Sequence, residues 1–186
     1  DPSDPASRVT EMKQMVKGLH ENDIRVIMDV VYNHVYNAAN HSFNKTVPGY
    51  YFRYDDNGSL VNNSGCGNDT ASERKMMRKY IVDSVTYWAK NYNVDGFRFD
   101  LMGLIDTETM KEVRAALDEI DPSIIILGEG WDMNTTMDEG EMTIQPNAYQ
   151  VASDGTNNGI AFFNDSVRDG LKGSVFSDTD TGFVSG

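Results

Sequence analysis

The segment Val94-Asp95-Gly96-Phe97-Arg98-Phe99-Asp100-Leu101 is a short, mostly apolar run that carries an arginine and an aspartate near its end. Strand-forming residues in a run of this length predict a β-strand. A helical pattern lies on each side of it, one beginning at Ser72, a good N-cap, and one over residues 107–120, ahead of a proline. We expect the face of the earlier helix to consist of Met76, Met77, Tyr80, Ile81, Ser84, Val85 and Trp88, with both methionines in the core.

Further apolar runs continue this alternation toward both ends of the chain. Residues 24–31 are nearly all apolar and β-branched, which predicts a strand buried on both faces. Residues 123–128 and 160–163 predict two more strands. Helices are expected over residues 7–22, with Ser7 or Asp4 as the N-cap, and over residues 167–172.

Strands that alternate with helices predict an α/β fold of parallel strands joined by right-handed crossovers. Two architectures fit this order, a (β/α)8 TIM-type barrel and an open doubly wound sheet. No glycine-rich phosphate-binding fingerprint follows a strand, which weakens the interpretation as a dinucleotide-binding protein. A complete barrel needs roughly 250 residues and eight strands. If the fold is a barrel, residues 1–186 form a single partial domain with about half of it.

The composition limits the classes of function. The 186 residues are 39% apolar and 24% charged, as in globular proteins, and the net charge of −13 argues against a nucleic-acid partner. No apolar run is long enough to span a bilayer, and no signal peptide is visible. Because residue 1 is Asp and not Met, the localisation stays open. The sequence does not determine the oligomeric state either.

Two long polar segments, residues 33–71 and 132–158, each follow a predicted strand. The first is so rich in turn-forming residues that we expect no core in it, and loops of this length are usually functional. In both architectures the ligand site lies at the carboxyl ends of the strands. The two segments are therefore expected to form the walls of a substrate cleft.

Acidic residues stand at the ends of three strands: Asp29, Asp100 and Glu129. Arg98 shares a strand face with Asp100 and favours its ionised form, whereas an apolar run and Trp131 beside Glu129 favour a protonated carboxyl group. An anionic nucleophile beside a protonated acid suits glycoside hydrolysis with retention, which holds two carboxyl groups about 5–5.5 Å apart. Neighbouring strands, about 4.8 Å apart, can supply that separation.

Three motifs resemble the short sequence regions of the α-amylase superfamily of glycoside hydrolases, in the order that this family has them. They are Asp29-Val30-Val31-Tyr32-Asn33-His34, Gly96-Phe97-Arg98-Phe99-Asp100 and Gly128-Glu129-Gly130-Trp131. The detail of residues 100–103, 128–132, 63–74 and 160–165 is similar to type I pullulanases. The resemblance covers nearly the whole chain, from about residue 9 to residue 176, and implies a partial (β/α)8 barrel with strands three to six.

The resemblance implies roles for the charged residues. Asp100 would be the nucleophile that forms a covalent glycosyl-enzyme intermediate. Glu129 would protonate the glycosidic oxygen and later activate water. Arg98 would keep Asp100 ionised and oriented, and Asp29 would support this network from within the barrel.

The resemblance also implies substrate contacts. His34 and Asn33 would lie at the cleft, with His34 hydrogen-bonded to the sugar, and Trp131 would offer an aromatic face to a glucose ring. Leu101 and Cys66 would line the pocket. Each has a simpler interpretation: His34 as a core histidine, Trp131 as a packing residue and Cys66 as an inert buried thiol.

The family's third catalytic carboxylate follows a His-Asp dipeptide, and no histidine of this chain fits that position, since all three precede residue 94. We therefore expect the chain alone to be an inactive fragment. The expected activity of the complete protein is cleavage of α-1,6-glucosidic linkages in pullulan and branched α-glucans. The chemistry needs no cofactor or metal, although a structural Ca²⁺ occurs in some superfamily members.

Three other interpretations stay open. Within the superfamily the chain could belong to an isoamylase-like enzyme or to an amylase that cleaves α-1,4 linkages. A metal-dependent lyase or isomerase of the enolase type would use Asp100 and Glu129 as Mg²⁺ ligands, against which Arg98 argues by repulsion. A non-catalytic fragment would bind glucan without cleaving it.

Overall fold

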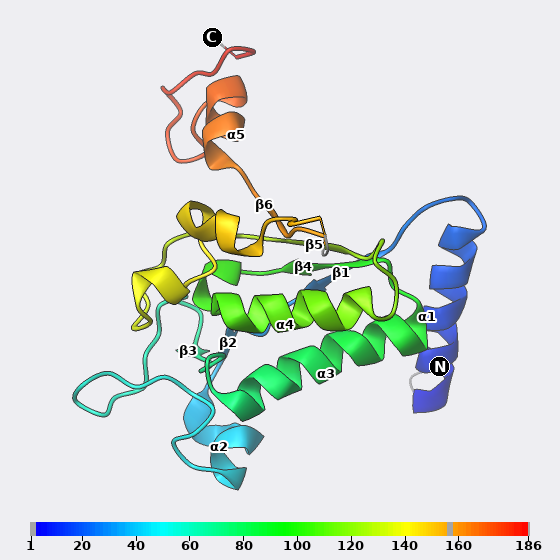
Figure 1. Cartoon of the computed structure of the whole chain (residues 1–186), viewed down its shortest axis with the longest axis horizontal. Helices are drawn as coiled ribbons and strands as arrows, with labels where there is room; N and C mark the ends of the chain where they lie inside the picture. The colour runs from blue at the N-terminus through cyan, green and yellow to red at the C-terminus, as the bar shows by residue number, and fades with distance from the viewer. Residues whose placement is uncertain (1–2, 156–157, 186) are drawn as a thin grey trace.

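The computed structural model describes residues 3–155 and 158–185. They form an α/β fold whose main sheet is parallel, as the sequence predicted (Figure 1). Its strands stand side by side in chain order: β1 (Ile27–Val30), β4 (Gly96–Phe99), β5 (Ile125–Gly128) and β6 (Ala161–Phe162). In this register Asp29 is level with Arg98, and Arg98 is level with Leu127. The carboxyl ends of the strands therefore meet at one edge of the sheet.

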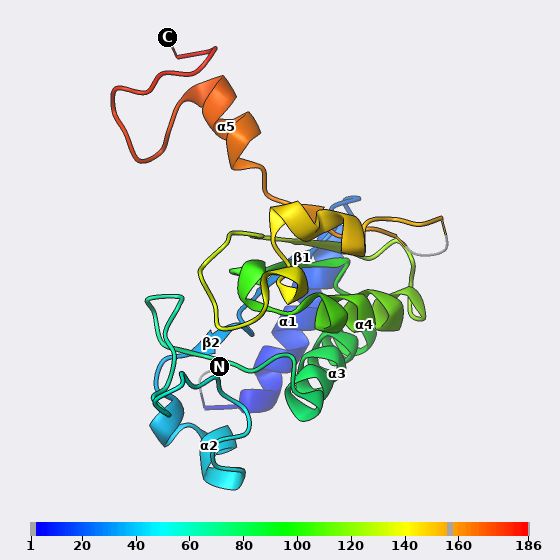
Figure 2. The same cartoon turned by 60° about the vertical axis from the view of Figure 1, so that its left-hand side comes forward.

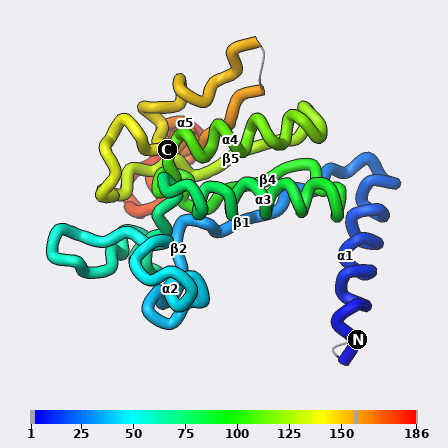
Figure 3. The backbone as a smooth tube through the Cα atoms, turned by 60° about the horizontal axis from the view of Figure 1, so that its bottom comes forward, coloured from blue at the N-terminus to red at the C-terminus, as the bar shows by residue number. Residues whose placement is uncertain are grey.

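The α-helices in the described residues are α1 (Pro5–His20), α2 (Ser42–Thr46), α3 (Lys75–Tyr92), α4 (Thr107–Asp118) and α5 (Asp165–Lys172). Four of them lie within a few residues of their predicted positions, whereas α2 lies in the first long segment, where no helix was predicted. Of the two predicted caps of α1, the Asp4 side chain accepts a hydrogen bond from the backbone N–H of Ala6 at 3.0 Å. Figure 3 shows α1 at the end of α3 and roughly crosswise to it, while α5 extends away from the sheet (Figure 2).

Helices α3 and α4 pack against each other and cover one side of the sheet (Figure 1). Their apolar faces and the strand residues Phe97, Phe99 and Ile126 belong to one buried core. The alternate strand residues point to the other side. There Ile27 is 42% exposed, and Val31, just after β1, is 52% exposed. The prediction that residues 24–31 are buried on both faces is therefore wrong, because the described helices cover only one face.

The start of α3 differs from the prediction. The helix begins at Lys75, with Arg74 at the N-cap position and no side-chain cap. Ser72 is fully buried, and its hydroxyl accepts a hydrogen bond from the backbone N–H of Asp106 at 3.0 Å. Met77 is buried as expected, but Met76 is 45% exposed, since the buried face runs through Met77, Ile81, Val85, Ala89 and Tyr92.

The first long segment is folded and partly buried, contrary to the expectation that it holds no core. β2 (His34–Val35) pairs antiparallel with β3 (Asn68–Asp69), and the 3-10 helix η1 (Ala38–Asn40) and α2 lie between them. Three of its apolar residues, Ala38, Phe52 and Ala71, are fully buried. Turn-forming residues around them do not prevent a small core.

The second long segment, residues 132–158, contains the 3-10 helices η3 (Glu139–Glu141) and η4 (Gln145–Val151). Met137, Met142 and Ile144 form a small apolar cluster of their own. Residues 156–157 of this segment lie outside the described residues, as do residues 1–2 and 186 of the predicted single domain. In the described ranges, no helix is both long and apolar enough to cross a membrane.

Candidate active site

Arg98 stands at the centre of the carboxyl edge of the sheet. Its Nη1 donates hydrogen bonds to Asp29 Oδ1 and to Asp100 Oδ1, both at 2.9 Å. Its Nη2 lies 2.6 Å from Glu129 Oε1. The three acids that the sequence placed at successive strand ends are thus brought together on one guanidinium group. Asp100 and Glu129 contact different terminal nitrogens of this group, Nη1 and Nη2.

The charge balance of the site follows from these contacts. Burial lowers the pKa of Arg98, but hydrogen bonds to Asp29 and Asp100 and the charge of Glu129 outweigh it, and the net pKa is raised. We expected apolar surroundings that keep Glu129 protonated. Glu129 Oε1 instead lies 2.6 Å from Arg98 Nη2, so a charged partner stands beside this carboxyl group and its surroundings are not purely apolar.

The turn after β4 fixes Glu129 through its backbone. Leu101 has a left-handed conformation, with φ of 39°, and its N–H donates to Glu129 Oε2 at 3.1 Å. The N–H of Gly103 donates to the backbone carbonyl of Glu129 at 3.0 Å. A branched residue rarely adopts positive φ, and doing so costs about 1–3 kcal/mol. This turn therefore stores backbone strain next to the candidate catalytic pair. Leu101 itself is half-buried.

Asn33 contacts Asp100 directly. Its fully buried amide donates to the backbone carbonyl of Asp100 at 2.6 Å and to Asp100 Oδ2 at 3.2 Å. His34 Nδ1 lies 2.5 Å from Asn33 Oδ1, so His34 reaches Asp100 only through this amide. His34 is half-buried rather than sealed in the core, and it also pairs in register with Asp69.

Trp131 lines a cavity of about 640 Å³ beside Glu129. Gln145 and Pro146 from the second long segment, and Asp165, Arg168 and Phe176 near the end of the chain, line it too. Trp131 is half-buried, so part of its side chain is accessible from this cavity. The lining of the cavity includes Glu129 but not Asp100. The space next to the predicted acid is therefore open on the side of Trp131.

Cys66 differs from its simpler interpretation. The thiol is free and the residue is exposed, not buried, in the turn before β3. It does not line the cavity that Trp131 lines, so the structure does not bring Cys66 together with Trp131.

Sequence reasoning missed two contacts at the site. The ring of Phe163, which follows β6, has its centroid 5.7 Å from the guanidinium carbon of Arg98. Arg53 of the first long segment is buried and bonded to the turn that follows β4, through the carbonyl of Leu104. In the sequence, Arg53 directly follows three aromatic residues, the last of which is Phe52. This is the only sequence signal for the burial of Arg53, and one such position is a weak signal.

The described residues offer no cluster of three or more His, Cys, Asp or Glu side chains arranged to hold a metal ion. Where Asp29, Asp100 and Glu129 meet, the guanidinium of Arg98 is their shared partner. A cation bound at the same point would be repelled by this group.

No protein-family model matches the chain. A pullulanase of Bacillus subtilis (strain 168) is 47% identical over all 186 residues. Along its whole length the chain is homologous to pullulanases. A pullulanase from Anoxybacillus sp. LM18-11, solved with maltotetraose, is 54% identical with a TM-score of 0.93 over 98% of this chain and 26% of that one. A pullulanase from Paenibacillus barengoltzii, solved with maltohexaose and α-cyclodextrin, is 49% identical with a TM-score of 0.94 over 100% of this chain and 28% of that one.

Pullulanases are glycoside hydrolases, so the homologues of this chain belong to the class that its motifs resemble. The chain spans about a quarter of the length of these pullulanases, for example 25% of the Bacillus subtilis protein. The parallel sheet and its helices match the corresponding part of the solved pullulanases.

Proposed function

We propose that this chain is part of the catalytic domain of a retaining glycoside hydrolase that cleaves α-1,6-glucosidic linkages in pullulan and branched α-glucans. One observation carries the proposal: Asp100 and Glu129, from adjacent strand ends, contact two nitrogens of the same guanidinium. Two carboxyl groups held this close suit a nucleophile and an acid that act on one sugar.

In the first step, an oxygen of Asp100 bonds to the anomeric carbon while the glycosidic bond breaks. Glu129 gives its proton to the departing oxygen. In the second step, Glu129 takes a proton from water, and the water oxygen displaces Asp100 from the sugar. Glu129 has to start protonated, so it must exchange its contact with Arg98 for one with the glycosidic oxygen.

The sheet topology supports the partial (β/α)8 barrel over the open doubly wound sheet. The described parallel strands are neighbours in chain order, with no reversal of direction along the sheet. Helices α3 and α4 lie on the same side. A barrel has both features, whereas a doubly wound sheet reverses its strand order and carries helices on both faces. Asp29 and Arg98 then face the barrel interior.

The substrate proposal rests on the relatives. The two solved pullulanases bind maltotetraose and maltohexaose, which are neutral. A neutral glucan needs no positive surface, so the net charge of −13 is compatible with it. We place His34 at the sugar, Trp131 under a glucose ring and Leu101 and Cys66 along the pocket. The chemistry is proposed to need no metal, with Ca²⁺ at most structural, and the isolated segment to be inactive.

Product analysis on pullulan tests the proposal. The complete protein that contains this chain should release maltotriose, because α-1,6 cleavage cuts pullulan between its maltotriose units. Panose or isopanose as the main product would indicate an α-1,4-acting amylase instead. Loss of activity with EDTA and recovery with Mg²⁺ would favour the enolase-type alternative. Glucan binding that Asp100→Asn leaves intact, without any cleavage by the parent protein, would indicate a binding module.

A further inference from the structure

Arg53 is a buried cation at the meeting point of both long segments. Its side chain is only 2% exposed. The backbone holds it in the first segment, since its N–H donates to the carbonyl of Asp69 at 3.0 Å and its carbonyl accepts from Val61 at 3.1 Å. A guanidinium at this depth destabilises a protein unless its nitrogens are paired. Its partners therefore indicate what it holds in place.

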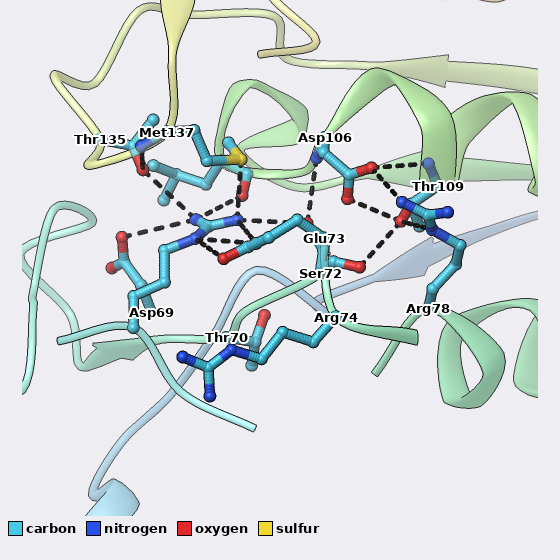
Figure 4. A network of polar contacts seen from close by, with 12 residues as sticks. Asp69, Thr70, Ser72, Glu73, Arg74, Arg78, Asp106, Thr109, Thr135 and Met137 are labelled. Carbon is cyan, nitrogen blue, oxygen red and sulfur yellow. Dashed lines mark hydrogen bonds and ion pairs between the residues drawn. The ribbon is translucent and has the colours of Figure 1, made fainter. Parts of the chain in front are cut away.

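One set of partners lies at the start of α3. The Arg53 Nη2 donates to Glu73 Oε2 at 2.8 Å and to Ser72 Oγ at 3.2 Å, and its Nε donates to Glu73 Oε2 at 3.2 Å. Glu73 is the principal counter-charge, because Asp69 Oδ2 is 3.9 Å away. Figure 4 shows Ser72, Glu73 and Asp69, which dashed lines join to the unlabelled guanidinium of Arg53.

The other set comes from the connections that follow β4 and β5. The Arg53 Nη1 donates to the carbonyl of Leu104 at 2.8 Å and lies 3.4 Å from the Thr135 hydroxyl. Its Nη2 lies 3.0 Å from the sulfur of Met137, and Thr135 and Met137 both come from the second long segment (Figure 4). One side chain thus joins both walls of the proposed cleft.

Leu104 connects this network to Glu129 through one short turn. The 3-10 helix η2 (Met102–Leu104) is fully buried, and the N–H of Leu104 donates to the carbonyl of Leu101 at 2.9 Å. Two further N–H groups of the turn donate to Glu129. The N–H of Leu101 donates to its carboxylate, and the N–H of Gly103 donates to its backbone carbonyl. Arg53 therefore binds Leu104 at one end of the strained turn, while the N–H of Leu101 at the other end donates to Glu129.

We propose that Arg53 is a positioning residue, which locks the connections after β4 and β5 so that Leu101 aligns the carboxyl group of Glu129 with Asp100. Arg53 touches neither carboxylate, and it acts only through Leu104 and the second long segment. The inference rests on the proposed roles of Asp100 and Glu129. It adds a link between the cleft walls and the chemistry that neither the strand-end motifs nor the sheet topology predicts.

Arg53→Lys tests this link in the complete protein. A lysine keeps the charge beside Glu73 but cannot reach Leu104, Ser72 and Thr135 together, because it lacks the planar fork. We expect kcat on pullulan to fall about 10- to 100-fold, as small displacements of catalytic groups do, with KM nearly unchanged. Glu73→Gln, at a position 35% exposed, removes the counter-charge and should give a smaller fall in the same direction.

Arg114→Lys is the matched control. Arg114 is 5% exposed, donates to the carbonyl of Ile124 at 2.7 Å and pairs with Asp118, so it is a buried arginine whose partners lie outside the turn after β4. At temperatures where all variants are folded, its kcat should equal that of the parent. Equal losses in Arg53→Lys and Arg114→Lys would overturn the positioning role and leave the proposed function standing.

Hydrogen exchange supplies a readout that needs no activity. The amides of residues 101–104 should exchange at least about tenfold faster in Arg53→Lys than in the parent, because local opening of the turn becomes easier. Exchange elsewhere in α3 and α4 should change little. Unchanged exchange at these amides in both Arg53→Lys and Glu73→Gln would refute the proposal. A parent protein inactive on pullulan would refute the proposed function, while this exchange measurement still tests Arg53.

Discussion

Arg98 contacts three acids through its two terminal nitrogens, and the surroundings of the acids differ enough to indicate different roles. Asp29 and Asp100 both lie 2.9 Å from Nη1, but the Asp29 side chain is 66% exposed and the Asp100 side chain 26%. Only Asp100 also has the Asn33 amide on its second oxygen. A carboxylate oriented from two sides suits a nucleophile, whereas an exposed one suits a supporting charge.

Asp100→Asn should therefore lower kcat of the complete protein by several orders of magnitude while binding of maltotetraose remains. The amide keeps the size and much of the hydrogen bonding of the carboxylate but cannot form the glycosyl ester. Steady-state kinetics and calorimetric titration measure the two effects. Asp29→Asn is the control, because it removes an acid bound to the same nitrogen. Similar losses in both variants would contradict the nucleophile assignment.

Tyr32 gives a pH dependence that can be traced to one side chain. Burial raises its pKa above the usual 10.0, although a hydrogen bond with Ser84 acts in the opposite direction. Because the folded state favours the neutral phenol, the unfolded state loses this proton first. The contribution of Tyr32 to the free energy of unfolding is therefore fully present below pH 10. It is lost as the pH rises through the higher pKa that Tyr32 has in the folded protein.

We expect Tyr32→Phe to weaken this loss of stability at alkaline pH. The measurement is the change of Tm between a pH below 10 and a pH above it, compared between the parent and the variant. The difference removes the contributions of other tyrosines that titrate in both proteins. The same alkaline decline in Tm for both would show that Tyr32 does not contribute to it.

Helix α3 shows how far local pattern determines an element. The stripe Met77, Ile81 and Val85 is buried on the sheet, while Met76, one position earlier, points outward. Met77→Ala should destabilise the fold by about 2–5 kcal/mol, because it leaves a cavity in the core. Met76→Ala should change the stability by less than about 0.5 kcal/mol, as at other exposed sites. Urea unfolding measures both, and equal effects would mean that the helix is rotated.

The strands and helices near residues 94–120 were predictable because their apolar periods are strong. β4 and α4 lie within two or three residues of the predicted ranges. The prediction of Ser72 as the N-cap was wrong, because the Ser72 hydroxyl instead accepts hydrogen bonds from Arg53 and from the backbone N–H of Asp106. Both residues are distant from it in sequence. The acids of the site were predictable from their strand ends. Their common contact with Arg98 depends on side-chain conformations that no local pattern specifies.

The sheet is covered on one side by α3 and α4, and its other side carries the candidate site. On that side Ile27, Val31 and Phe163 are 42%, 52% and 39% exposed. The interior of a barrel would bury these residues among the remaining strands. In the described part of the chain these three apolar side chains are exposed on the face that carries the charged site, and apolar surface that lacks a partner promotes association.

Expressed alone, residues 1–186 should therefore bind the dye ANS and self-associate, whereas the complete protein should do neither on this face. ANS fluorescence and light scattering measure the two effects. The double variant Ile27→Thr and Val31→Thr should lower both in the isolated segment without unfolding it, because both positions are exposed and threonine keeps the β-branched shape. A monomeric segment that leaves ANS fluorescence unchanged would show that this face needs no covering strands, which would contradict the barrel proposal.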